Sequence, residues 1–157
     1  MTTRSNAQRR DDAEDRRRLE VVSVSEETSS RMAATRARDN PRERRIRSAL
    51  HRRGLRFRIH YAAPGITRRS IDIAFPRAKL AVFCDGCFWH GCPVHGTTPK
   101  SNTSWWLEKI QTNVRRDANT DARLRDAGWQ VLRLWEHLSD EDAVESVLRC
   151  LDRCPRA

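Results

Sequence analysis

The segment DGCFWHGCPVHG, residues 85–96, concentrates side chains that bind metal ions. Cys87, His90, Cys92 and His95 lie within nine residues of one another. Thiolates and imidazoles are the ligands that zinc prefers in a tetrahedral site, and short spacings let one loop supply several of them. His137 follows an apolar stretch further along the chain and is a candidate for the fourth position. The alternative is that these residues are small buried thiols and surface histidines.

Two further cysteines, Cys150 and Cys154, form a CxxxC pattern near the end of the sequence. One of them could be a metal ligand, although a thiol buried on a helix face or a free thiol is an equally simple interpretation. The five cysteines are not spread at disulfide spacings, which indicates a reducing compartment and a metal site.

Carboxylates occur in two apolar stretches that precede this segment. Asp72 lies inside SIDIAF, and Asp85 ends LAVFCD. A charged carboxylate in an apolar strand needs a partner, and Mg²⁺ prefers such hard oxygen ligands. Adjacent strands that deliver two carboxylates to one point are typical of a metal-dependent nuclease. The alternatives are solvation at the strand ends or pairing with an arginine, and Glu43 is a weaker candidate of the same kind.

Aromatic side chains accompany the metal-binding pattern. Phe88 and Trp89 lie inside it, and Trp105 and Trp106 follow it. Exposed rings beside basic residues can stack on nucleic-acid bases or wedge between base steps. The alternative is that they cover the metal site or pack under a sheet. Two other residues, Trp129 and Trp135, are expected in the core.

The chain order of the elements that must position these residues predicts an α/β fold. Asn40, Pro41 and Gly54 are typical of the start and end of a helix over residues 41–53. Alternating or apolar runs predict strands over residues 56–60, 70–75, 79–84 and 129–135. Further helices are expected over residues 103–127 and 140–151, and a metal-organised loop over 87–102. This order suits a mixed central sheet flanked by helices.

The composition indicates a nucleic-acid partner. The 157 residues carry a formal net charge of +10 with a pI near 10.6, which favours a polyanion, although a merely basic protein is the alternative. No run of about 18 apolar residues predicts a membrane span, and no apolar signal core is present at the N-terminus. Residues 1–30 are polar and are expected to be a disordered tail.

Three stretches resemble the very-short-patch DNA mismatch repair endonucleases: DGCFWHGCPVHGT, WWLEKIQTNVRRD and LRDAGWQVLRLWEH. The stretch MAATRARDNPRERRIRSALHRRGLRFRIH also resembles the opening helix and strand of that family, so the resemblance spans about residues 32–137. It implies a restriction-endonuclease-like core with a structural zinc loop. It also implies Mg²⁺-dependent nicking of double-stranded DNA on the 5′ side of the thymine in T:G mismatches, which arise when 5-methylcytosine deaminates.

The resemblance also implies roles for individual residues. Asp72 would bind Mg²⁺, assisted by the backbone carbonyl of Cys84. His90 would be the general base that activates the attacking water, and Glu43 would orient the site. The implied zinc ligands are Cys87, Cys92, His95 and His137. The implied DNA wedge consists of Phe88, Trp89 and Trp106.

Two features depart from the family pattern. The chain reads PGITRRSID where some members read PGRPD, so the loop before Asp72 is longer. Asp85 stands where the best-known members carry an active-site histidine, and it could join the metal site or orient His90.

These observations predict an endonuclease domain over residues 31–152 between tails over 1–30 and 153–157. A monomer acting on DNA in the cytoplasm, at the nucleoid of a bacterial cell, is expected. Two alternatives are a restriction-fold nuclease with another DNA target and a zinc-containing DNA-binding module without catalysis. The sequence does not indicate repair-protein partners, the bases that flank the mismatch, or the function of the N-terminal tail.

Overall fold

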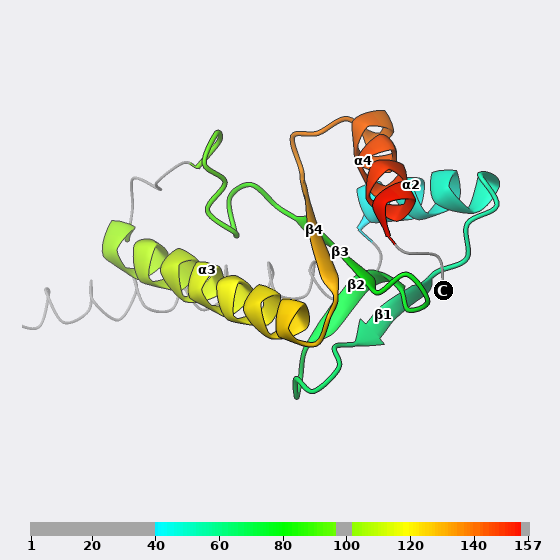
Figure 1. Cartoon of the computed structure of the whole chain (residues 1–157). Helices are drawn as coiled ribbons and strands as arrows, with labels where there is room; N and C mark the ends of the chain where they lie inside the picture. The colour runs from blue at the N-terminus through cyan, green and yellow to red at the C-terminus, as the bar shows by residue number, and fades with distance from the viewer. Residues whose placement is uncertain (1–39, 97–101, 155–157) are drawn as a thin grey trace, which may run out of the picture. The chain divides into compact units, whose positions relative to one another are not determined.

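Four strands form one sheet (Figure 1), and two of them carry Asp72, Cys84 and Asp85. The computed structural model describes residues 40–96 and 102–154. The tail predicted over residues 1–30 and most of that over 153–157 lie outside the described residues. The elements follow in the order α2 (Pro41–Arg52), β1 (Arg58–Ala62), β2 (Ser70–Phe75), β3 (Leu80–Asp85), α3 (Thr103–Asp126), β4 (Gln130–Trp135) and α4 (Asp140–Arg153). The predicted order of helices and strands is confirmed.

The sheet is mixed, as predicted. Its strand order is β1-β2-β3-β4, with β1–β2 and β2–β3 antiparallel and β3–β4 parallel. Neighbouring parallel strands need a long crossover connection, and α3 lies within the one that joins β3 to β4. The parallel ladder runs from Leu80↔Gln130 to Asp85↔Trp135, so it carries Asp85 to the end of the sheet.

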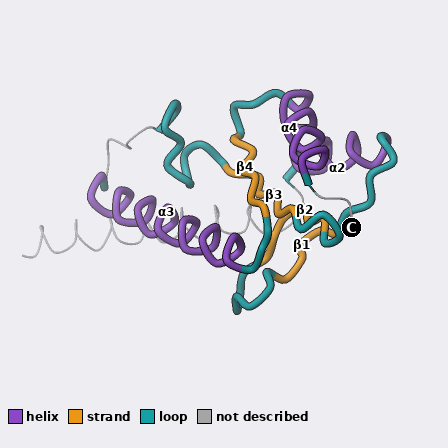
Figure 2. Tube along the Cα trace, viewed as in Figure 1, coloured by secondary structure: helices purple, strands orange, loops and turns teal. Residues whose placement is uncertain are grey.

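Helices cover both faces of the sheet. Helices α2 and α4 lie together on one side of the sheet and α3 lies on the other (Figure 2). Side chains of α2 and α4 belong to one apolar cluster, and Leu124 of α3 belongs to a second. The larger core contains Ile46, Leu50, Ile73, Phe75, Leu80, Val82, Leu134, Val144 and Val147. The smaller core contains Ala63, Ile66, Ile71, Ala74, Ala81, Phe83, Leu124 and Trp129. The candidate site residues therefore lie on strands and helices that two apolar clusters hold in place.

The start of α4 is set by a capping interaction. The Ser139 hydroxyl accepts a hydrogen bond from the Asp142 N–H at 3.0 Å, which satisfies one free donor of the first turn.

No helix in the described residues is long and apolar enough to cross a membrane.

The prediction was least accurate at the edges of the sheet. The first strand was expected at residues 56–60 but begins at Arg58 and ends at Ala62, because Phe57 packs against the larger core before pairing begins. Trp129 is buried as expected, whereas Trp135 is half-buried at the end of the edge strand β4.

Candidate active site and metal cluster

Asp72 lies where the pairing between β2 and β3 is interrupted. The antiparallel ladder pairs Ile73 with Val82 and does not continue toward Asp72. Instead, the backbone N–H of Cys84 donates a hydrogen bond to Asp72 Oδ2 at 2.8 Å. The carboxylate thus takes the place of a backbone acceptor, which holds its orientation at this end of the sheet.

Three carboxylates influence one another at this point. The pKa of Asp72 is raised to about 6: burial is the main cause, the charges of Glu43 and Asp85 contribute, and the hydrogen bond from Cys84 opposes the rise. The three acids come from α2, β2 and β3. Like charges held this close favour a cation among them.

Glu43 supplies an unsatisfied oxygen to this group. Its side chain is buried, and its Oε1 accepts no hydrogen bond. Arg47 Nη1 lies 3.3 Å from the same atom, so the contact is an ion pair without hydrogen-bond geometry. A buried carboxylate oxygen with no hydrogen-bond donor fits a divalent cation that takes hard oxygen ligands and keeps several waters, as Mg²⁺ does.

The thiol of Cys84 lies beside Asp72 and is largely buried. Its pKa is raised to about 12, mainly by burial and in part by the charge of Asp72. The thiol is therefore neutral at physiological pH and is a poor ligand or nucleophile.

His90 is held by a short contact with α3. Its Nδ1 lies 2.6 Å from Asp117 Oδ2 and 3.6 Å from Asp85 Oδ1. Burial alone would raise the pKa of the Asp117 carboxyl. The hydrogen bond with His90 and the charge of Arg133 outweigh this effect and hold that pKa below its usual value. The contact favours the tautomer with the proton on Nδ1, which leaves the lone pair on Nε2.

Arg133 on β4 neutralises the acids behind His90. Its guanidinium lies 2.6 Å from Asp85 and 2.7 Å from Asp121, with Asp117 at 3.6 Å. Burial would lower the pKa of Arg133, but hydrogen bonds to Asp121 and the charge of Asp85 raise it. Asp85, whose role the sequence left open, is thus paired with an arginine while remaining close to the His90 ring.

Sequence reasoning missed three residues of this site: Asp117, Asp121 and Arg133. The available signal was helical spacing, because Asn113, Asp117 and Asp121 recur every four residues on one face of α3. Asn113 donates to the Trp89 carbonyl at 3.0 Å. A polar stripe on the side of a helix that faces its neighbours indicates a binding role for that face.

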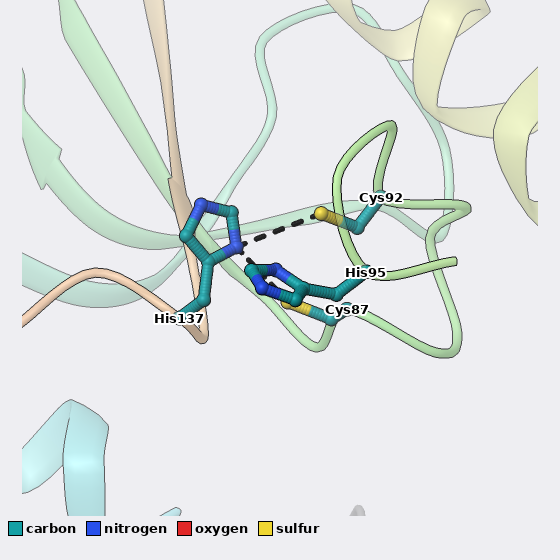
Figure 3. Close-up of side chains that lie close together, drawn as sticks. All are labelled: Cys87, Cys92, His95 and His137. Atoms are coloured by element: carbon teal, nitrogen blue, oxygen red, sulfur yellow. Dashed lines mark hydrogen bonds between the residues drawn. The ribbon is translucent and has the colours of Figure 1, made fainter. Parts of the chain in front are cut away.

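Cys87, Cys92, His95 and His137 converge from two parts of the chain (Figure 3). One ligand atom from each lies within 4.8 Å of all the others. His137 Nδ1 lies 3.2 Å from Cys87 Sγ and 3.5 Å from Cys92 Sγ. Zinc bonds of about 2.0–2.3 Å give a tetrahedron with edges of roughly 3.3–3.8 Å, so the spacing and donor types fit zinc. His90 lies within the same loop but points its Nδ1 at Asp117.

The aromatic residues of the loop and of α3 form a continuous cluster. Ring centroids of Phe88 and Trp89 are 5.1 Å apart, and Trp106 lies 5.3 Å from Phe88 and 5.6 Å from Trp89. Trp105 stacks edge-on against Trp106 at 4.7 Å and remains 39% exposed. The cluster therefore packs against itself and is only partly covered, which leaves both interpretations from the sequence open.

Cys150 and Cys154 lie apart from the metal cluster. Cys154 is buried in the larger apolar core, and Cys150 is half-buried against it. Cys150 fits the interpretation of a thiol on a helix face, whereas Cys154 follows the last turn of α4 and is buried in the core.

Comparisons with known proteins show which family this chain resembles. A family model described as DNA mismatch endonuclease Vsr matches residues 22–95. The type II nicking enzyme V.NaeI of Lentzea aerocolonigenes is 42% identical over 126 residues, which cover 78% of this chain and 75% of that enzyme. The type II nicking enzyme V.XorIIP of Xanthomonas oryzae is 41% identical over 75% of this chain and 86% of its own length. The DNA mismatch endonuclease Vsr of Escherichia coli is 39% identical over 69% of this chain and 68% of its own length.

Proposed function

The chain belongs to the Vsr family of DNA mismatch endonucleases, which have a restriction-endonuclease-like fold, and it is a DNA endonuclease. We propose that it nicks one strand of duplex DNA on the 5′ side of the thymine in a T:G mismatch. The reaction is Mg²⁺-dependent hydrolysis of a phosphodiester, and the mismatches arise by deamination of 5-methylcytosine.

One observation carries the proposal most directly. An imidazole held by a carboxylate, with His90 Nδ1 2.6 Å from Asp117, lies at the same end of the sheet as the acids Asp72 and Asp85. A general base beside a cation site is what in-line attack of water on a phosphodiester requires.

Each residue has a separate task in this scheme. Nε2 of His90 accepts a proton from the attacking water, and Asp117 stabilises the imidazolium that results. Asp72 and the Cys84 carbonyl would hold Mg²⁺, while Glu43 and Asp85 complete the acidic surroundings. When bound, Mg²⁺ supplies positive charge that stabilises the developing charge at phosphorus and at the leaving oxygen.

The cysteine–histidine cluster would support the base. Cys87 and Cys92 lie on either side of His90 in the chain, so zinc bound by them, His95 and His137 would fix the loop that carries the imidazole. Of the aromatic cluster, Phe88, Trp89 and Trp106 would wedge into the DNA beside the mismatch.

We also propose that the chain acts as a monomer on chromosomal DNA in the bacterial cytoplasm. The endonuclease domain would span residues 31–152, between tails at either end. The net charge of +10 supports binding to DNA phosphates.

A substrate panel tests the proposal. The full chain with zinc and Mg²⁺ is incubated with labelled duplexes that hold a T:G mismatch in varied contexts, a matched T:A pair, or a branch point. Nicking confined to T:G duplexes is expected. Equal cleavage of matched or branched DNA would favour a restriction-fold nuclease with another target, and tight binding without cleavage would favour a DNA-binding module.

A further inference from the structure

The loop between β1 and β2 is attached to the C-terminal part of α3 (Figure 1). Arg123 Nη2 donates a hydrogen bond to the Gly65 carbonyl at 2.6 Å. Ala63 and Ile66 of the same loop are buried against Leu124 and Trp129. Because apolar contacts and a hydrogen bond both connect them, the loop and the helix present their arginines as one surface.

Three arginines of this surface, Arg69, Arg116 and Arg123, lie close enough for their charges to influence one another. Burial lowers the pKa of Arg69 first, and the charges of Arg116 and Arg123 lower it further, while Asp117 acts in the opposite direction. Arg116 and Arg123 lie seven residues apart in α3, which places them on one side of the helix two turns apart. Like charges on one side of the helix repel one another.

Asp117 influences the charge of Arg69, but not through a direct ion pair. Within residues 40–96 and 102–154, no carboxylate lies within ion-pairing distance of the Arg69, Arg116 or Arg123 guanidinium. Arg133 shows the contrast, because it is paired directly with Asp85 and Asp121. Guanidiniums that lie near one another without a directly paired acid are suited to an external anion.

The surface adjoins the candidate active site. Arg116 directly precedes Asp117, whose carboxylate holds His90 at 2.6 Å. Arg116 also contributes to the lowered pKa of Asp117, after the larger effects of burial and His90. A phosphate bound by these arginines would therefore lie close to the phosphate that is cleaved.

We infer that Arg69, Arg116 and Arg123 form a clamp for a backbone phosphodiester of the DNA strand beside His90. The inference rests on the proposed function only in taking DNA as the ligand. The clamp contacts phosphate rather than bases, so it strengthens binding to matched and mismatched DNA alike.

Salt-dependent binding tests the clamp separately from cleavage. Binding of the zinc-loaded full chain to fluorescent T:G and T:A duplexes is measured by anisotropy across a KCl series without Mg²⁺. Arg116→Ala should reduce the slope of log K against log[KCl] by about 0.9 on both duplexes, since each phosphate neutralised contributes about that amount. Arg116 is exposed, so this change should leave the fold intact.

Matched variants make the result specific. Arg69→Ala should reduce the slope of log K against log[KCl] in the same way as Arg116→Ala. Arg116→Lys should keep the slope of the unmodified protein because it retains the charge. Arg153→Ala removes an equally exposed charge from the end of α4, whose core contacts are with the opposite face of the sheet, and should leave the slope close to that of the unmodified protein.

The clamp is refuted if Arg116→Ala and Arg69→Ala both bind with the slope of Arg153→Ala. A decrease in slope on the T:G duplex but not on the T:A duplex would also contradict the clamp, because that pattern indicates contact with the mismatch. Failure of the unmodified protein to nick T:G DNA would overturn the proposed function, while the slopes would still decide the clamp.

Discussion

His90 is oriented by a residue that lies in the middle of a helix, far from it in sequence. The short contact between Nδ1 and Asp117 directs Nε2 away from the helix and makes it the nitrogen that can accept a proton. Behind this pair, Arg133 balances the charges of Asp85 and Asp121. The imidazole therefore acts within a network in which every acid has a named partner.

Asp117→Asn tests this orientation. The amide can accept or donate at Nδ1 and no longer stabilises the imidazolium, so nicking should fall by about 100-fold or more. Single-turnover rates at saturating enzyme give the chemical step, and DNA affinity should change little. Asp126→Asn, an exposed change on the same helix, is the control. A rate equal to that of the control would show that Asp117 does not act through His90.

Asp72→Asn separates catalysis from stability. Nicking should be lost, while the Mg²⁺-free, zinc-loaded protein should become more stable by about 1–2 kcal/mol at pH 8, because no buried charge then faces Glu43 and Asp85. The amide oxygen can still accept the hydrogen bond from Cys84.

The pH dependence of this gain has a definite sign. The folded-state pKa of Asp72 is raised to about 6 from 3.8, so the proton stabilises the folded state at low pH, and that stabilisation is lost as pH rises through about 6. In urea unfolding, the Asp72→Asn variant should have the larger free energy of unfolding at pH 8. The difference from the unmodified protein should shrink toward pH 4. A variant less stable than the unmodified protein at pH 8 would contradict the account.

The loop of residues 86–96 packs closely against helix α3. Gly91 adopts a φ of 63°, and a Cβ there would lie 3.0 Å from Val114 Cγ2. Loop and helix thus approach closely at the point where His90 and Asn113 connect them.

Gly91→Ala should lower the free energy of unfolding by more than its backbone strain alone explains, because the new Cβ also crowds Val114. Gly65 is a matched control, since its φ is 71° and a Cβ there would meet nothing within 4 Å. Gly65→Ala should cost about 1 kcal/mol from its left-handed conformation, and Gly91→Ala should cost more. Adding Val114→Ala should recover the excess. Equal losses at the two glycines in urea unfolding would refute the close contact.

The sequence was sufficient to predict the elements but not the contacts between them. Apolar runs predicted β2 and β3 to within a residue, because both strands are buried on two sides. The alternation over residues 56–60 was misleading, since Leu55 and Phe57 pack into the core from a loop. Asp117 and Arg133 could not be found from local patterns, because their role comes from the approach of α3 and β4 to the loop. Local motifs did include the four residues that converge in the cysteine–histidine cluster, and the family resemblance separated them from His90.

Two segments far apart in the sequence meet at the cysteine–histidine cluster. His137, two residues after β4, meets Cys87 and Cys92 from the loop after β3. Bound zinc would therefore link the loop, the sheet and the start of the last helix.

Cys92→Ser should lose zinc and lower the thermal stability of the domain, because structural zinc binding is coupled to folding. Metal content and thermal unfolding are measured together on the purified full chain. Cys150→Ser removes a half-buried thiol outside the cluster and should retain one zinc per chain. A Cys92→Ser protein that is stable without metal would show that the cluster is not a structural zinc site.

Mapping the nick on a single T:G duplex is the most direct test of the proposed activity. Each strand is labelled in turn, and the product is sized against a ladder after incubation with Mg²⁺, beside the matched T:A duplex. The account predicts one nick, immediately 5′ of the mispaired thymine and absent from the matched duplex. Cleavage at the same position in both duplexes, or in the strand that carries the guanine, would contradict it.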